Sequence, residues 1–247
     1  MGKSIMITGA SSGIGKALAF EMASRGYSLG LVARNGNALG TIRGEIDSRH
    51  PDCKTAALTL DVTDYASVPA VVEEVAVALD GLDIVFVNAG IAGSGKVGTG
   101  GFTEARRMIE TNVIGAIATI EASVACFLEQ GSGHVVGVSS VAAFRGLPGT
   151  AAYCASKAGL AVYLEALRAE VHRKNIDVTV LYPGYIDTPL NNMLKSRPFL
   201  IPVEKGAAII ARMIEKKVKS STVPKMPWSL LSPMLRMLPT RTIAKMG

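Results

Sequence analysis

"TGASSGIG" (8–15) lies between the apolar run "SIMIT" (4–8) and the start of a helical pattern. Its glycines, Gly9, Gly13 and Gly15, allow a sharp turn and let backbone N–H groups approach a ligand closely. A helix N-terminus behind such a turn attracts an anion such as a pyrophosphate. The glycines could instead serve only strand–helix packing, but their place at the first strand-to-helix turn favours phosphate binding.

Strand and helix patterns alternate along the rest of the chain. The predicted strands are apolar nearly throughout, as expected of parallel strands that are buried on both faces. They span 4–8, 28–33, 55–60, 83–88, 134–139 and 177–182, and the predicted helices span 14–25, 37–49, 65–79, 103–129, 152–174 and 203–218. This alternation predicts a single-domain α/β fold, a doubly wound Rossmann-type parallel β-sheet flanked by helices.

Composition and charge narrow the classes of function. Apolar residues make up 49% of the chain and charged residues 19%, which predicts a large core rather than disorder. The net charge of +6 suits an anionic ligand and does not by itself indicate nucleic acid. Three cysteines without CxxC spacing, and only three histidines, predict no metal site and no disulfide framework. No signal peptide or membrane-spanning run is evident, so we expect a cytoplasmic location.

"YCASK" (153–157) places Tyr153 and Lys157 four positions apart, on one face of a predicted helix. Such a pair is ordinarily an exposed one. A cation about 4 Å away, at an effective dielectric of about 20, is nevertheless worth about 4 kcal/mol. That energy lowers a tyrosine pKa of about 10 by roughly three units. The pair is therefore a candidate proton donor near neutral pH.

Five motifs occur in the order of a known family. They are "TGASSGIG" (8–15), "NAG" (88–90), "VSS" (138–140), "YCASK" (153–157) and "YPG" (182–184). Residues 3 to about 220 thus resemble the single-domain branch of the short-chain dehydrogenase/reductase family. The resemblance implies hydride transfer between a nicotinamide dinucleotide and a carbonyl or secondary alcohol. It also implies a homo-oligomer, a dimer or tetramer built on the helices around 103–129 and 152–174.

The resemblance implies four catalytic residues, Asn112, Ser140, Tyr153 and Lys157. Tyr153 would protonate the substrate oxygen, Lys157 would lower the pKa of Tyr153, and Ser140 would hydrogen-bond the substrate. Ser139 is an alternative to Ser140, but strand alternation turns it to the opposite side. Asn112 would lie in a locally distorted helix and hold a water that links Lys157 to solvent.

The same resemblance places the cofactor at the C-terminal ends of the strands. The second strand ends with Ala33, where NAD-preferring relatives carry an acid, and Arg34 follows it. A guanidinium pairs with a 2′-phosphate, so we favour NADP(H) over NAD(H), unless Arg34 is merely solvated. Asp61 would accept a hydrogen bond from the adenine amino group, or instead cap a helix. The complete predicted cofactor set is Gly9, Ser11, Ser12, Gly13, Ile14, Gly15, Arg34, Asn35, Asp61, Val62, Asn88, Ala89, Gly90, Tyr153, Lys157, Pro183, Gly184, Ile186 and Thr188.

Two segments carry apolar residues outside the motifs. Residues 186–202, here named the lid segment, predict either an apolar pocket for a hydrophobic substrate or ordinary helix packing. Residues 222–247 form a predicted extension beyond a catalytic domain of 1–221. Apolar residues alternate there with Lys225, Arg236, Arg241 and Lys245. The pattern predicts either peripheral membrane contact or packing on a subunit or the chain's own body.

Two other classes of function stay open. One is a non-catalytic redox sensor or scaffold that binds the dinucleotide, and the other is a membrane-peripheral interaction protein that acts through its tail. The joint presence of Ser140, Tyr153 and Lys157 favours an enzyme over both. We expect a small-molecule substrate and no nucleic-acid partner.

Overall fold

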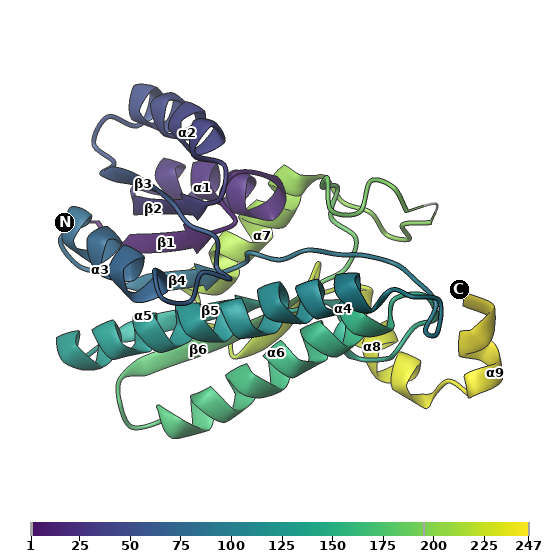
Figure 1. Ribbon diagram of the computed structural model, residues 1–247. Helices are drawn as coiled ribbons and strands as arrows, with labels where there is room; N and C mark the ends of the chain where they lie inside the picture. The colour runs from purple at the N-terminus through teal and green to yellow at the C-terminus, as the bar shows by residue number, and fades with distance from the viewer. Residues whose placement is uncertain (1, 195, 247) are drawn as a thin grey trace.

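The computed structural model describes residues 2–194 and 196–246 and contains one parallel seven-stranded sheet (Figure 1). The first residue of the predicted catalytic domain and the last residue of the predicted extension lie outside the described residues. The strand order is β3-β2-β1-β4-β5-β6-β7, so the direction of winding reverses between β1 and β4. The strands are β1 (Ser4–Thr8), β2 (Ser28–Ala33), β3 (Thr55–Thr59), β4 (Ile84–Val87), β5 (Gly133–Val138), β6 (Ile176–Pro183) and β7 (Ser220–Val223). The predicted doubly wound fold is confirmed.

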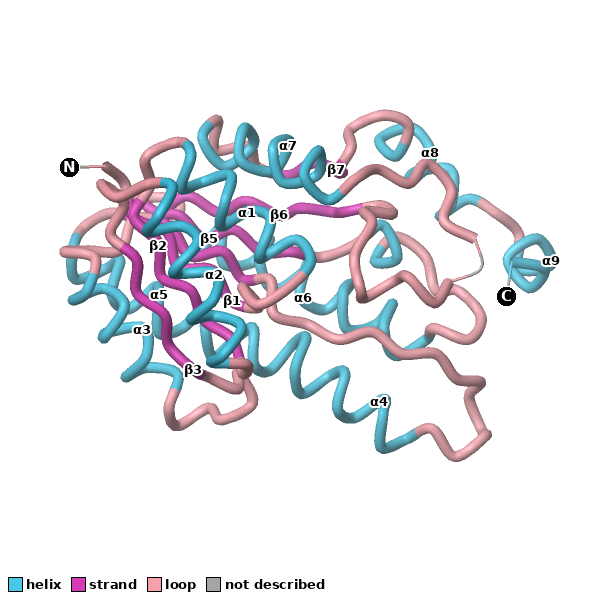
Figure 2. The backbone as a smooth tube through the Cα atoms, turned by 90° about the horizontal axis from the view of Figure 1, so that it is seen from above, coloured by secondary structure: helices cyan, strands magenta, loops and turns pink. Residues whose placement is uncertain are grey.

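Helices cover both faces of the sheet. Helices α1, α2 and α7 cover the face seen in Figure 2, and α3, α4, α5 and α6 cover the other face. Each layer closes its own apolar core, one centred on Leu18, Ile46 and Ile210 and the other on Val75 and Phe127. The bounds are α1 (Gly13–Ser24), α2 (Gly36–Arg49), α3 (Val68–Ala78), α4 (Phe102–Ile109), α5 (Ala116–Gln130), α6 (Ala151–Glu170), α7 (Val203–Glu215), α8 (Trp228–Met237) and α9 (Thr240–Ile243).

The last part of the chain departs from the predicted elements. The strand β7 pairs in parallel with β6, although "SSTV" is too short and polar to signal a strand. The predicted boundary between 221 and 222 falls inside β7, so the extension begins within the sheet. The helices α8 and α9 follow at the carboxyl side of the sheet (Figure 1).

The predicted helix 103–129 is one run of helical structure with a change of pitch in the middle. A π-helix, Glu110–Gly115, joins α4 to α5. Within the described residues, Phe102–Gln130 is the one run long and apolar enough to cross a membrane by length and composition. In this fold α5 buries Ala116, Ile120 and Phe127 against the sheet. The apolar side chains of α5 therefore form part of the core.

His134 on β5 is a buried titratable group between the strands. Only 3% of the residue is exposed, and its Nε2 lies 2.9 Å from Thr179 Oγ1. The Thr179 hydroxyl donates to the Val218 carbonyl, so Nε2 of a neutral His134 donates to Thr179. Burial lowers the pKa of His134 from 6.5 to about 4, more than the charge of Asp177 raises it.

We expect His134 to make the fold sensitive to mild acid. As the pH falls, His134 takes up a proton in the unfolded chain before it does so in the folded protein. Neutral His134 therefore makes its whole contribution to the free energy of unfolding above the unfolded pKa of 6.5, and this contribution is lost as the pH drops to about 4. The loss is about 3 kcal/mol at ~1.36 kcal/mol per pKa unit. Urea unfolding at neutral and acidic pH measures it in the wild type and in His134→Gln, which keeps a donor but does not titrate. An equal acid sensitivity of the two proteins would contradict the assignment.

Candidate active site

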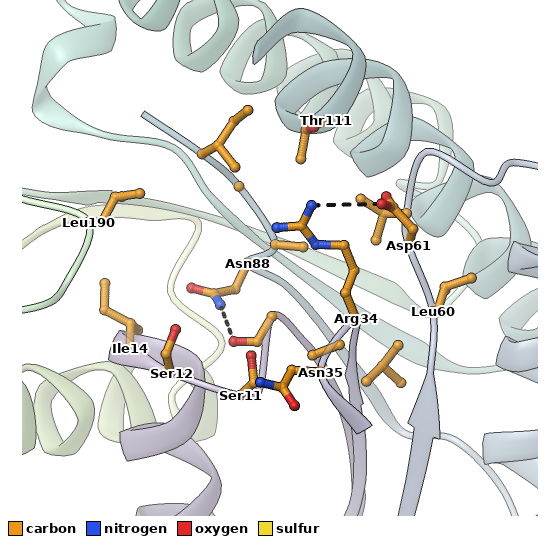
Figure 3. Close-up of a pocket in the computed structure, with 18 of the residues that line it drawn as sticks. Ser11, Ser12, Ile14, Arg34, Asn35, Leu60, Asp61, Asn88, Thr111 and Leu190 are labelled. Carbon is orange, nitrogen blue, oxygen red and sulfur yellow. Dashed lines mark hydrogen bonds and ion pairs between the residues drawn. The ribbon is translucent and has the colours of Figure 1, made fainter. Parts of the chain in front are cut away.

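A cavity of about 1010 Å³ lies at the carboxyl ends of the strands, where the winding of the sheet reverses (Figure 3). Ligand pockets are typically about 300–1,000 Å³, so this one admits a large ligand. Most of the predicted cofactor set lines it: Gly9, Ser11, Ser12, Gly13, Ile14, Arg34, Asn35, Asp61, Val62, Asn88, Ala89, Gly90 and Thr188.

Other lining residues were not predicted. Most are chain neighbours of predicted positions, and the motifs could have indicated them by proximity. Thr111 neighbours the predicted catalytic residue Asn112 in the π-helix, and only the fold brings this part of the helix to the cavity. The added residues are Val32, Ala33, Gly36, Asn37, Leu60, Ile91, Thr111, Pro189 and Leu190.

The glycine-rich turn has the geometry of a phosphate site. Gly9 and Gly13 have φ angles of +68° and +52°, a region that favours glycine. A Cβ on Gly15 would lie 2.3 Å from the Gly9 carbonyl oxygen, so the helix sits directly against the turn. The N-cap residue Ser12 makes no side-chain capping hydrogen bond within the described residues, which leaves the first N–H groups of α1 free. These residues fit a pyrophosphate.

Strand β4 is tied to this turn by a cluster of hydrogen bonds. The Asn88 side chain donates to the Thr8 carbonyl at 2.9 Å. The Thr8 hydroxyl accepts from the backbone N–H groups of Asn88 and Ala89 at 3.0 and 3.1 Å. The two chain segments that form the cavity floor are therefore held in register, and the cavity is preorganised.

Arg34 and Asp61 face one another across the cavity rim (Figure 3). Arg34 Nη1 lies 3.8 Å from Asp61 Oδ2, and the Arg34 side chain is 68% exposed. Asp61 Oδ1 also accepts from the backbone N–H and hydroxyl of Thr63 at 3.0 and 2.7 Å. Burial raises the pKa of Asp61, but these hydrogen bonds and Arg34 outweigh it and lower the pKa overall. Asp61 forms a local turn rather than a helix cap.

Asn35 has a structural partner as well as a place at the cavity. It is the N-cap residue of α2, and its side-chain oxygen accepts from the Ala38 N–H at 3.0 Å. The oxygen is thus occupied, and the amide nitrogen is the group that could meet a ligand.

The four predicted catalytic residues lie at the carboxyl end of β5 and its surroundings. Ser140 follows β5, and its hydroxyl lies close enough to the Tyr153 phenol to lower the phenol's pKa. Lys157 is 5% exposed, and its Nζ donates to the Val138 carbonyl at 2.9 Å. Asn112 is fully buried in the π-helix. The tertiary structure thus brings together side chains from three parts of the sequence.

The end of β4 joins Asn112 to Lys157. Asn112 Oδ1 accepts from the Ile91 N–H at 2.8 Å, and its Nδ2 donates to the Ile91 carbonyl at 2.9 Å. A Cβ on Gly90 would lie 3.1 Å from Asn112 Oδ1 and 3.4 Å from Lys157 Nζ, so both side chains pack tightly against this glycine. The helix is distorted where the resemblance implies. The water-binding role of Asn112 stays a prediction.

The two serines at the end of β5 have different surroundings. Ser139 is 2% exposed, and its hydroxyl donates to the Lys157 carbonyl at 2.7 Å. It therefore anchors α6. Ser140 Oγ accepts from the Ala142 N–H at 3.1 Å and faces Tyr153. The geometry agrees with the preference for Ser140.

The pKa of Tyr153 shifts upward, whereas the sequence predicts a downward shift. Burial raises the pKa of the phenol, and the nearby Ser140 hydroxyl lowers it by less. Lys157 does not contribute to this shift, because its ammonium group is directed to the Val138 carbonyl. Burial lowers the pKa of Lys157 itself to about 8, so it is still mostly protonated at neutral pH. Four-residue spacing alone thus does not make Tyr153 acidic in this structure.

The predicted nicotinamide-side residues lie where β6 leads into the lid segment. Pro183 ends β6, and Ile186 forms an isolated bridge with Ile201. Gly184 packs so closely on Trp228 that a Cβ would lie 2.1 Å from the indole Nε1. The sequence reasoning did not connect Trp228 with this site. Its motifs end well before α8, so no local signal could have done so.

The lid segment meets the pocket expectation in part, because Leu190 lines the cavity. Ile186 is buried, whereas the larger apolar side chains that follow it are partly or largely exposed and do not pack in a helix. The exposed fractions are 50% for Leu190, 90% for Met193, 45% for Leu194, 54% for Phe199 and 38% for Leu200.

The fold and these adjoining sites define the class of the protein, a dinucleotide-binding oxidoreductase. The family model described as short chain dehydrogenase matches residues 3–198. The chain therefore belongs to the short-chain dehydrogenase/reductase family, as its motifs imply.

Curated relatives cover most of the chain. It is 40% identical over 238 residues to an uncharacterized oxidoreductase of Mycobacterium tuberculosis, covering 96% of this chain and 94% of that one. It is also 36% identical over 189 residues to an NADP-dependent 3-hydroxy acid dehydrogenase of Schizosaccharomyces pombe, covering 76% and 73%.

Solved structures share the fold. A short-chain dehydrogenase/reductase of Burkholderia phymatum in complex with NAD has a TM-score of 0.86 at 22% identity, covering 96% of this chain and 93% of that one. An alcohol dehydrogenase of Thermococcus sibiricus complexed with 5-hydroxy-NADP has a TM-score of 0.81 at 26% identity, covering 90% and 96%. The family thus includes proteins bound to either dinucleotide.

Proposed function

We propose that the protein is an NADP(H)-dependent oxidoreductase acting on the carbonyl or secondary alcohol of a hydrophobic small molecule. The observation that carries the proposal is the meeting of Ser140, Tyr153, Lys157 and Asn112 beside the dinucleotide cavity. When bound, the nicotinamide supplies or accepts the hydride.

The protein's own groups handle the substrate oxygen and its proton. The Ser140 hydroxyl holds the oxygen next to the Tyr153 phenol, whose pKa the nearby Ser140 already lowers. Burial raises the pKa of the phenol, which keeps it protonated but makes it a weaker acid, so transfer of its proton depends on a nearby positive charge. Lys157 lies on the same face of α6, and its positive charge would favour the phenolate left by that transfer once the ammonium group turns from the Val138 carbonyl toward the phenol.

Arg34 supports NADP(H) as the preferred dinucleotide. It stands at the cavity rim directly after β2, its side chain is 68% exposed, and Ala33 offers no acid to bind ribose hydroxyls. Asp61 holds the guanidinium only loosely at 3.8 Å. A 2′-phosphate would therefore compete well for this arginine. The name of the Schizosaccharomyces pombe relative, which states NADP dependence, agrees with this proposal.

Replacing Arg34 with Ala tests the cofactor preference. A hydrogen bond to a charged group is worth about 1.5–3 kcal/mol, so kcat/KM for NADPH should fall about 10- to 150-fold. The value for NADH should change little. Steady-state kinetics with both dinucleotides measures the ratio, and Arg49→Ala, an exposed arginine on α2 away from the cavity, is the matched control. A wild-type preference for NADH, or an equal loss with both dinucleotides, would contradict the proposal.

The same proposal includes a homo-oligomer in the cytoplasm. Apolar side chains on the outer faces of the helical layer support self-association, with Leu128 of α5 49% exposed and Val162 of α6 64% exposed. These helices are the ones that the family resemblance implies for subunit contact. The number of subunits stays a prediction.

A further inference from the structure

The helix α8 has one buried face and one exposed apolar face. Trp228 and Ser232 are 6% and 2% exposed and lie against the body of the protein. On the opposite side Leu230, Met234 and Met237 are 61%, 58% and 83% exposed. Their spacing of four and three residues places them in one line along the helix. We name these three residues the α8 stripe. Such a line of large apolar side chains is unusual on a surface that meets only water.

The charged residues of the chain segment that carries the α8 stripe all have the same sign. The segment 224–247 contains Lys225, Arg236, Arg241 and Lys245 and no acidic residue. It thus carries four of the six net positive charges of the chain on about a tenth of its length. An apolar stripe in a segment whose charged residues are all cations is complementary to an anionic phospholipid surface, where the apolar side chains enter the acyl boundary and the cations meet the headgroups.

The helix α8 lies between the lid segment and the loop that follows Ser140. On the lid side, the Trp228 ring lies 5.8 Å from the Phe199 ring, edge to face. On the other side, the Arg236 guanidinium stands 5.5 Å from the centre of the Phe144 ring. Arg145 also donates to the Leu238 carbonyl at 3.2 Å. Figures 1 and 2 show α8 and the lid segment on the same side of the molecule.

The lid segment continues the apolar surface. Met193 and Phe199 are 90% and 54% exposed, and Phe199 contacts the same Trp228 that packs on Gly184. The exposed apolar side chains therefore border the candidate active site rather than a remote face. Trp228 also lies near Tyr185 at the end of β6, with the two ring centroids 6.0 Å apart.

We propose that the α8 stripe and the lid segment dock on an anionic phospholipid membrane, and that the hydrophobic substrate reaches Tyr153 from the bilayer. The evidence for docking is the exposed apolar α8 stripe, the cations of the same segment and the position of α8 beside the lid segment. The substrate route rests on the proposed function. Lys225, Arg241 and Lys245 supply the headgroup contacts, whereas Arg236 is engaged with Phe144.

Vesicle flotation of the full-length protein tests the docking. We expect binding to phosphatidylcholine vesicles that contain phosphatidylserine, and at least about tenfold weaker binding without it or at high salt. The triple variant Leu230→Ser, Met234→Ser, Met237→Ser should lose binding by a similar factor. The matched control is Val77→Ser, which removes an exposed apolar side chain from α3, away from the α8 stripe and the helices proposed for subunit contact, and should bind as the wild type does.

Two further measurements separate the outcomes. Light scattering reports the number of subunits. If the α8 stripe variant has fewer subunits than the wild type, and the wild type does not float with the vesicles, the α8 stripe is a contact with a second copy. That result overturns the docking proposal. Equal flotation of the α8 stripe variant and its control also overturns it. Turnover of a water-soluble ketone with NADPH should be unchanged in both variants. Absence of that turnover in the wild type contradicts the proposed function alone, because flotation does not depend on it.

Discussion

Turnover is expected to fall about a hundred- to ten-thousandfold in Tyr153→Phe, the range that a lost general acid or base costs. The substitution removes only the phenolic oxygen, which lies near Ser140. The ring keeps its packing, and the dinucleotide cavity is lined by other residues. We therefore expect the dissociation constant for NADPH to stay within about a factor of a few.

The comparison needs turnover and cofactor binding measured on the same preparations. Tyr163→Phe is the matched control, because Tyr163 lies on the same helix, α6, and its hydroxyl donates to Glu121 away from the site. That variant should keep wild-type turnover. Full activity in Tyr153→Phe would refute the assignment of the proton donor and leave the non-catalytic sensor or scaffold as the better reading.

Gly15→Ala is expected to disrupt cofactor binding through backbone contact. The new methyl group would lie 2.3 Å from the Gly9 carbonyl oxygen and 2.8 Å from the Asn88 amide nitrogen. Neither the helix nor the turn can give way without moving the phosphate site. Such overpacking costs about 1–3 kcal/mol, which corresponds to roughly a 5- to 150-fold weaker affinity for NADPH.

Gly44→Ala provides the control for this substitution. Gly44 is exposed on α2, and a Cβ there would meet no atom within 4 Å. The exchange should leave NADPH affinity unchanged and raise stability by about 0.5–1 kcal/mol, because alanine favours the helix. Isothermal titration and thermal unfolding measure both effects. Unchanged affinity in Gly15→Ala would show that the turn does not hold the pyrophosphate.

Local sequence was sufficient for the elements whose pattern is regular. The strand β1, the glycine turn and α1 follow from an apolar run, three glycines and a helical period, all within about twenty residues. The short polar strand β7 carries no such pattern, because an edge strand that pairs on one side needs little apolar character. Its formation depends on the open edge of β6, which exists only in the folded sheet.

The pKa values show a similar limit. The spacing of Tyr153 and Lys157 predicts that they share a helical face, and in α6 they do. The spacing does not predict where the Lys157 ammonium points, and the nearby Val138 carbonyl receives it. Burial then dominates both groups, raising the pKa of Tyr153 and lowering that of Lys157. Desolvation depends on every neighbouring atom, and a motif does not contain that information.

By itself, the sequence determined the order of strands and helices up to α7, the family and the candidate residues for chemistry, because these depend on residue type and short-range period. The tertiary structure decided what those residues face. It joined Asn112 to Lys157 through Gly90, set Arg34 against Asp61, and packed Trp228 on Gly184. Each of these contacts joins residues far apart in the chain, and only the packing of the whole sheet and its helices determines such distances.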